Sequence, residues 1–270
     1  MSAPSRVRTF VRIDRQLVRV SVRGAGRPLL LIMGLGGNIE MWDPLERALN
    51  ARGIQTIAYD ASGTGDSPPR LVPRRMGGLA RQAAHVLDAL GHPCADVLGV
   101  SFGGAVAQQL TLNNPHRVRR LVLASTTCGL GGVPGKPVAL ALLATPLRYY
   151  SPAFLRRTAG LLYGPPATND EQLLRTQTKA RRARPPSWWG YLGQLAAAAG
   201  WSSLPWLHRI RRPTLVLSGA ADPIVPPVNA RILAARIPGA ELEIVPGAGH
   251  LLLMEHAEQA AARIATFLAS

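Results

Sequence analysis

The sequence predicts an α/β fold in which a mostly parallel, eight-stranded sheet has helices on both faces. Short apolar runs, which are typical of buried strands, alternate with stretches of helical periodicity. Loops rich in glycine and other turn-forming residues follow most of the apolar runs. The length of 270 residues and the apolar content of 47% suffice for one large domain, with or without an insertion.

The strands and helices follow from the hydrophobic pattern in chain order. Alternation of apolar and polar residues over 7–13 and 16–22 predicts a half-exposed hairpin. Continuous apolar runs predict buried parallel strands at residues 28–32, 55–59, 96–99, 120–124, 213–218 and 242–245. Helical spacing predicts helices at residues 41–51, 76–90, 102–113, 228–237 and 255–268. This regular alternation places function at the carboxyl ends of the strands.

Residues 128–210 interrupt the alternation. Glycine and proline separate short helical patterns there, and the stretch holds every tryptophan except Trp42. We expect a helical cap over the carboxyl edge of the sheet, inserted into a core formed by residues 1–127 and 211–270. Aromatic side chains of the cap that face the site would form an apolar acyl pocket, while most of them are expected to be ordinary core.

The formal net charge of +16 comes almost entirely from arginines spread from Arg6 to Arg263. They form no basic stripe interleaved with aromatics, so we expect no nucleic-acid partner and a solvated arginine surface. A weak attraction to an anionic particle surface is the alternative. The sequence has no apolar run of membrane-spanning length and no secretory signal, and Cys94 and Cys128 fit a reducing cytoplasm. The oligomeric state is left open.

The feature around which the site is organised is the run Gly99-Val100-Ser101-Phe102-Gly103, between a predicted strand and a predicted helix. This is the G-x-S-x-G pattern of a nucleophile elbow. A sharp turn lifts the serine hydroxyl clear of the sheet, and the glycines omit side chains that would collide across it. The alternative is that Ser101 merely caps a helix. The strand, turn and helix context favours a nucleophile.

Two further residues complete a constellation in the order Ser, Asp, His. Asp222 and His250 each follow a predicted strand, as Ser101 does. In acyl transfer, histidine takes the serine proton and an aspartate orients the imidazole, so these residue types predict catalysis by Ser101, His250 and Asp222. We interpret Asp60 and Asp66 as turn formers, because they precede the nucleophile.

The glycine-rich loop at residues 33–38 lacks the lysine and the spacing of a phosphate-binding loop. We expect it to bring the backbone N–H of Leu35 toward the nucleophile, where it and the N–H of Phe102 would form an oxyanion hole. No metal or nucleotide signature is present, so no cofactor is expected.

Several less generic stretches carry a resemblance to a known family. They are Gly103-Gly104-Ala105-Val106-Ala107-Gln108-Gln109, Val133-Pro134-Gly135-Lys136-Pro137, Gly200-Trp201-Ser202-Ser203, Trp206-Leu207-His208 and Arg236-Ile237-Pro238. From about Leu29 to Leu268 the chain resembles the intracellular medium-chain-length poly(3-hydroxyalkanoate) depolymerases, a branch of the alpha/beta-hydrolase superfamily. The resemblance implies the alpha/beta-hydrolase fold, with Ser101 as nucleophile, Asp222 as acid and His250 as base.

The resemblance further implies hydrolysis of polyesters stored in cytoplasmic granules, so the expected partner is a granule or a small ester. The chain departs from the family pattern at Phe102, where tryptophan is expected, and at Met33, where the pattern expects Asn-Gly first. Two alternatives stay open: a carboxylesterase or lactonase for small soluble esters, and a non-catalytic protein that binds granules or an acyl ligand.

Overall fold

The computed structural model describes residues 6–165 and 170–270 and contains the predicted eight-stranded sheet. Its strand order is β1-β2-β4-β3-β5-β6-β7-β8. The first two pairings in this order are antiparallel and the others are parallel, which confirms the mostly parallel sheet. The strands are β1 (Arg6–Ile13), β2 (Gln16–Arg23), β3 (Arg27–Ile32), β4 (Ile54–Tyr59), β5 (Ala95–Val100), β6 (Val118–Ala124), β7 (Thr214–Gly219) and β8 (Glu241–Val245).

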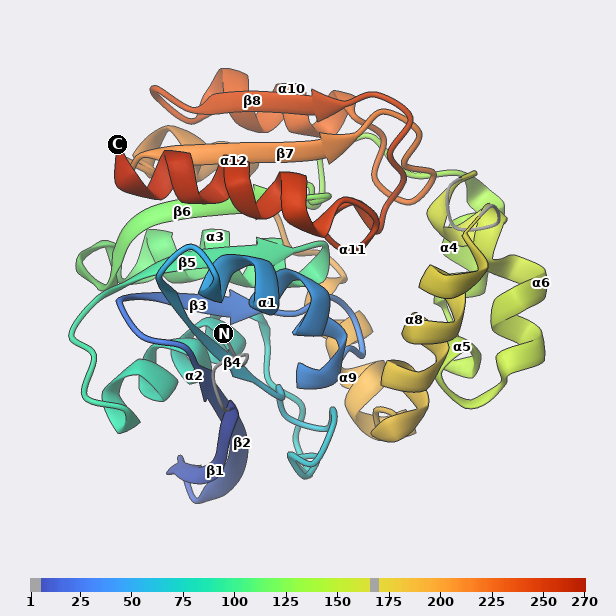
Figure 1. Ribbon diagram of the computed structural model, residues 1–270, viewed down its shortest axis with the longest axis horizontal. Coiled ribbons are helices and arrows are strands. Elements are labelled where there is room, and N and C mark those ends of the chain that lie inside the picture. Colours follow the sequence, from blue (N-terminus) through green and yellow to red (C-terminus); the bar gives the residue numbers. More distant parts are fainter. Residues whose placement is uncertain (1–5, 166–169) are drawn as a thin grey trace.

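Helices cover both faces of this sheet (Figure 1). The helices of the core are α1 (Asp43–Asn50), α2 (Met76–Ala89), α3 (Phe102–Asn113), α10 (Val228–Arg236), α11 (Leu252–Glu255) and α12 (Ala257–Ala269). Successive residues of β3 serve opposite faces: Leu29 packs with α1, α11 and α12, whereas Leu30 packs with α2, α3 and α10. Among the described residues, no helix is both long and apolar enough to cross a membrane.

Two predicted helices differ from the observed ones. The helix expected at 41–51 begins as a 3₁₀ turn, η1 (Ile39–Trp42), and α1 starts only at Asp43, with a proline in its first turn. The helix expected at 255–268 is two helices, because the backbone of His256 (φ −124°, ψ 46°) leaves the helical region between α11 and α12.

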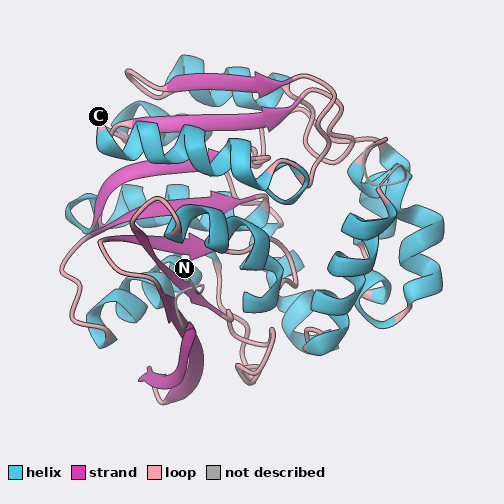
Figure 2. Cartoon of the chain, viewed as in Figure 1, coloured by secondary structure: helices cyan, strands magenta, loops and turns pink. Residues whose placement is uncertain are grey.

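The cap segment, which we define as residues 128–210, has its α-helices beyond the carboxyl ends of the strands, where the arrowheads point in Figures 1 and 2. Its last turn (Leu204–Arg209) instead leads to the amino end of β7 and packs on the core. It carries the helices α4 (Pro137–Leu143), α5 (Leu147–Tyr150), α6 (Pro152–Tyr163), α8 (Glu171–Ala183) and α9 (Trp188–Ala198), and the 3₁₀ turn η3 (Leu204–Arg209). Outside the cap segment, a further 3₁₀ turn of the core, η2 (Pro115–Arg117), precedes β6. The boundaries at 127/128 and 210/211 stay a prediction.

The expectation of solvated arginines is wrong at four positions. Arg19, Arg23, Arg148 and Arg181 are all buried. Arg19 binds the carboxylates of Asp60 (2.6 Å) and Glu40 (2.7 Å). Asp60 also accepts the backbone N–H groups of Ile39 (2.9 Å) and Asp66 (3.0 Å), so it organises a turn, as predicted. Burial raises the pKa of Asp60 to about 6.

Candidate active site

The turn between β5 and α3 holds Ser101 in a conformation that few non-glycine residues adopt (φ 55°, ψ −121°). The turn is crowded. A Cβ atom on Gly99 would lie 2.3 Å from the carbonyl oxygen of Gly103, and one on Gly103 would lie 2.0 Å from that of Ile32. Both glycines are therefore required by close backbone approach, as the sequence predicted. The turn is anchored by the N–H of Ser101, which donates to the carbonyl of Ala124 (2.9 Å).

The structure brings Ser101, His250 and Asp222 together from three loops at the carboxyl edge of the sheet. His250 Nε2 lies 3.1 Å from Ser101 Oγ, and His250 Nδ1 lies 2.7 Å from Asp222 Oδ2. The other oxygen of Asp222 accepts the N–H groups of Ile224 and Val225, each at 2.9 Å, which fixes the carboxylate. With its proton on Nδ1, the imidazole donates to Asp222 and accepts from the hydroxyl of Ser101.

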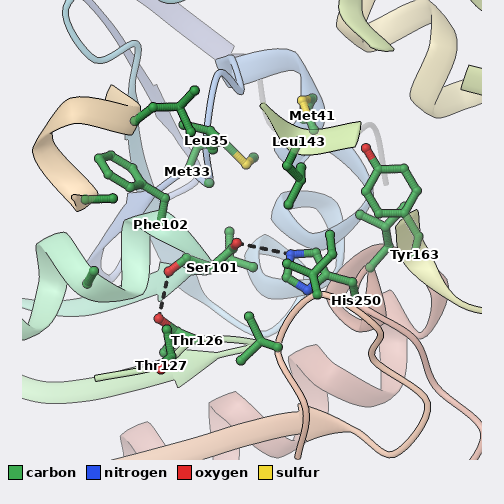
Figure 3. Close-up of a pocket in the computed structure, with 18 of the residues that line it drawn as sticks. Met33, Leu35, Met41, Ser101, Phe102, Thr126, Thr127, Leu143, Tyr163 and His250 are labelled. Atoms are coloured by element: carbon green, nitrogen blue, oxygen red, sulfur yellow. Dashed lines mark hydrogen bonds between the residues drawn. The ribbon is translucent and has the colours of Figure 1, made fainter. Parts of the chain in front are cut away.

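The cap segment also contacts His250. The N–H of His250 donates to the carbonyl of Tyr163 at the end of α6 (2.9 Å). The ring of Tyr163 stacks on the imidazole, with 6.4 Å between the ring centroids. Figure 3 shows the two side chains next to each other on one side of Ser101. The orientation of the imidazole is thus set by the cap as well as by Asp222.

The peptide between Leu35 and Gly36 is held by the cap at both of its polar atoms. The carbonyl oxygen of Leu35 accepts from the hydroxyl of Tyr149 (2.6 Å) and from the guanidinium of Arg148 (3.0 Å). The N–H of Gly36 donates to the side chain of Gln194 (2.7 Å). Leu35 and Phe102 lie together on the side of Ser101 away from Tyr163 (Figure 3), and Phe102 is the first residue of α3. An oxyanion hole built from their N–H groups stays a prediction.

A cavity of about 220 Å³ lies between Ser101 and the cap. Ser101 and His250 lie at the bottom of the cavity, and Met33, Met41 and Leu143 form part of its apolar walls (Figure 3). A largely apolar cavity with a few convergent polar groups is typical of a small-molecule site. In the described part of the chain, no group of three or more His, Cys, Asp and Glu side chains is placed to hold a metal ion.

Four side chains of the cap that contact the site or its glycine-rich loop were not predicted from the sequence. Arg148, Tyr149 and Arg181 line the cavity, and Gln194 holds Gly36. The aromatic content of residues 128–210 was a signal for an apolar pocket. No spacing in the sequence distinguishes Arg148 and Arg181 from the exposed arginines, because their burial depends on contacts with distant residues.

Comparison with known proteins gives the following similarities. Residues 29–263 match the model of the family described as "Alpha/beta hydrolase family". The chain is 42% identical over 261 residues to a poly(3-hydroxyalkanoate) depolymerase from Ectopseudomonas oleovorans, covering 96% of this chain and 91% of the relative. A hydrolase from Pseudomonas aeruginosa PA01 superposes with a TM-score of 0.82 at 29% identity, covering 97% of this chain and 98% of the other. The enol-lactonase from Burkholderia xenovorans LB400 shares the fold (TM-score 0.84, 22% identity, 97% and 100% covered).

Proposed function

Because the chain belongs to the alpha/beta hydrolase family, and within it to the poly(3-hydroxyalkanoate) depolymerases, we propose that Ser101 cleaves the ester bonds of poly(3-hydroxyalkanoate) or of its oligomers. The observation that carries this proposal is the hydrogen-bonded series from Ser101 to His250 (3.1 Å) and from His250 to Asp222 (2.7 Å). The chain is an ester hydrolase by its family, so the hypothesis of a non-catalytic binder is not retained.

The proposed reaction has two steps. His250 takes the proton of the Ser101 hydroxyl as the oxygen attacks the ester carbonyl, and Asp222 stabilises the imidazolium that forms. The tetrahedral intermediate collapses to an acyl-enzyme, and His250 returns the proton to the departing hydroxyl group. Water activated by His250 then releases the acid and restores Ser101.

The N–H groups of Leu35 and Phe102 are the proposed donors to the oxyanion. The two donors come from different segments. Phe102 follows the tight turn at Ser101, and Leu35 lies in the glycine-rich loop at residues 33–38. Removing one such donor typically costs about 2.7–4 kcal/mol in the free energy of activation. The cap fixes the peptide between Leu35 and Gly36, which adjoins the peptide that carries the Leu35 N–H. This supports the role, because a preorganised donor needs no rearrangement during the reaction.

The size of the cavity supports a second candidate function. A cavity of about 220 Å³ with mostly apolar walls is of a size that suits a small ester. A carboxylesterase or lactonase that acts on small esters would use the same three residues in the same two steps. The two candidates differ in whether a polymer end can reach Ser101.

The proposed polymeric substrate also suggests where the protein works. Poly(3-hydroxyalkanoate) is a hydrophobic solid, so the protein would act at the surface of a polyester granule in the cytoplasm. Exposed Trp188 and Trp189 on α9 offer apolar contacts for such a surface.

The test compares a polymer with a small ester. Purified protein is incubated with an amorphous suspension of medium-chain poly(3-hydroxyalkanoate), and, separately, with p-nitrophenyl octanoate. We expect the suspension to clear and 3-hydroxy acids to appear in the supernatant, together with release of nitrophenol. Rapid release of nitrophenol without clearing or free hydroxy acids would favour the small-ester function, and no turnover of either substrate would contradict both.

A further inference from the structure

Two of the four buried arginines differ from the other two in their surroundings. Arg19 binds Glu40 (2.7 Å) and Asp60 (2.6 Å), and Arg23 binds Asp43 (3.0 Å). Arg148 and Arg181 have exposed fractions of only 4% and 2%, yet among the described residues no carboxylate lies within ion-pair distance of either. A buried charge without a counter-charge is costly, since buried charges in proteins are generally paired.

The neighbours of these two guanidiniums are neutral. The guanidinium of Arg148 contacts the Tyr191 hydroxyl and donates to the carbonyl of Leu35 (3.0 Å). That of Arg181 donates to Gln177 (2.6 Å) and to the hydroxyl of Tyr163 (3.3 Å). Burial raises the pKa of Tyr191 to about 12, so this hydroxyl stays protonated at neutral pH and cannot supply the missing negative charge.

Both guanidiniums converge on the same space. They lie 4.8 Å (Arg148) and 5.9 Å (Arg181) from the centroid of the Tyr149 ring, and both line the cavity that holds Ser101 and His250. Nε of Arg181 is buried and has no hydrogen-bond partner in the described structure. Arg181 is linked to the base through Tyr163, whose hydroxyl it contacts and whose ring stacks on His250.

We propose that Arg148 and Arg181 form a carboxylate subsite that receives the free acid end of a 3-hydroxyacyl chain while the neighbouring ester lies at Ser101. The inference rests on the proposed function, since it names the part of the ester substrate that the cap recognises. Guanidinium groups match carboxylates in charge and in geometry, and the buried setting strengthens the attraction.

This subsite fixes which bond breaks. In a polyester the residue with the free carboxylate contributes its 3-hydroxyl group to the last ester bond. Ser101 Oγ bonds to the carbonyl carbon of that ester, the bond from this carbon to the 3-oxygen breaks, and His250 gives its proton to that oxygen. One 3-hydroxy acid anion leaves, and water then releases the shortened chain from Ser101. The chain is cut from its acid end, one unit at a time.

The test uses a matched pair of substrates, the dimer of 3-hydroxyoctanoate and the methyl ester of that dimer, in which the carboxylate is masked. We expect wild-type protein to cleave the free acid with a kcat/KM about 10–100-fold higher than the methyl ester, the usual value of hydrogen bonds to a charged group. Arg181→Gln lowers this ratio by a similar factor, and Arg181→Lys, which keeps the charge, lowers it less. The control is Arg182→Gln, because Arg182 is the adjacent, exposed arginine of α8 and leaves the ratio as in wild type.

Equal rates for the two dimers in wild-type protein would overturn the subsite, as would an equal loss on both substrates in Arg181→Gln, which indicates a structural role. Turnover of p-nitrophenyl octanoate without discrimination between the dimers rejects the subsite and leaves the proposed function intact. If no ester is cleaved, the proposed function fails, and calorimetric titration with 3-hydroxyoctanoate decides the subsite: heat of binding in wild type that Arg181→Gln loses supports it, and no binding overturns it.

Discussion

The two walls of the cavity are built in different ways. The core wall presents backbone groups and short polar side chains at the ends of strands, with Ser101 and Asp222 fixed by turn geometry and backbone hydrogen bonds. The cap wall presents long side chains, among them Tyr149, Arg148 and Tyr163, which reach across to the core. On the proposed mechanism, the core wall therefore provides the reacting groups, and the cap wall positions them and defines the space for the substrate.

The largest expected effect comes from replacing the proposed nucleophile, which belongs to the core wall. Ser101→Ala removes the attacking oxygen, so kcat for p-nitrophenyl octanoate falls by about 10⁴–10⁶-fold. The thermal midpoint of unfolding measures whether the fold is kept. Ser270→Ala, at the far end of the chain, is the control and keeps wild-type kcat. A Ser101→Ala variant within tenfold of wild type would contradict the mechanism.

Replacing one leucine in each wall compares how much the two walls contribute to the free energy of unfolding. Leu98 is fully buried in β5, so Leu98→Ala leaves a cavity and costs about 2–5 kcal/mol in the free energy of unfolding. Leu143 lies half-buried on the cap side of the cavity, so Leu143→Ala costs less stability and raises KM for p-nitrophenyl octanoate. Urea denaturation and steady-state kinetics measure both variants. Equal losses of stability would contradict the division between the walls.

The contact between the cap and the glycine-rich loop at residues 33–38 is tested with Tyr149→Phe, which removes one donor to the carbonyl of Leu35. We expect kcat to fall about tenfold, the value of one buried hydrogen bond, because the loop loses its fixed orientation. Tyr150→Phe is the matched control, since the adjacent Tyr150 donates to Pro186 instead and is exposed. A change confined to KM would indicate that Tyr149 only shapes the pocket.

The smallest expected effect concerns Glu255, whose carboxylate accepts the N–H of Gly249 (3.0 Å), next to His250. Burial raises the pKa of Glu255 above its ordinary value, so the folded state holds this proton more tightly than the unfolded state. The resulting stability is present at acidic pH and is lost as the pH rises through the raised pKa. Glu255→Gln abolishes this titration. In urea denaturation, the free energy of unfolding of the variant should rise relative to that of wild type as the pH increases from 4 to 8. A difference between the two proteins that does not change with pH would contradict the assignment.

The core was predictable because local patterns determine it. The strand expected at 96–99 is observed as Ala95–Val100, since apolar side chains fill both of its faces. The convergence of Ser101, Asp222 and His250 followed from parallel strands ending at one edge. The helix expected at 255–268 was wrong at His256, because the apolar spacing continues through a position where the backbone turns away.

The cap wall was not predictable in the same way. Arg148 meets Leu35 at a sequence separation of 113 residues, and Gln194 meets Gly36 at 158. Hydrophobic periodicity describes which face of a helix is covered, not which distant backbone group it meets. The composition suggested a solvated arginine surface, which fits exposed Arg182 but not its buried neighbour Arg181.

The hydrogen bond from His250 to Tyr163 has a consequence for substrate entry. If the cap swung outward as a rigid body, it would break the hydrogen bond between Tyr163 and the loop of His250. The same movement would break the hydrogen bonds of the cap to the carbonyl of Leu35. An open molecule of that kind would admit substrate but would be idle, and only reclosure would restore its chemistry. On the proposed mechanism, ester cleavage would therefore require the cap in its place, with Tyr163 bonded to His250 and Tyr149 bonded to Leu35.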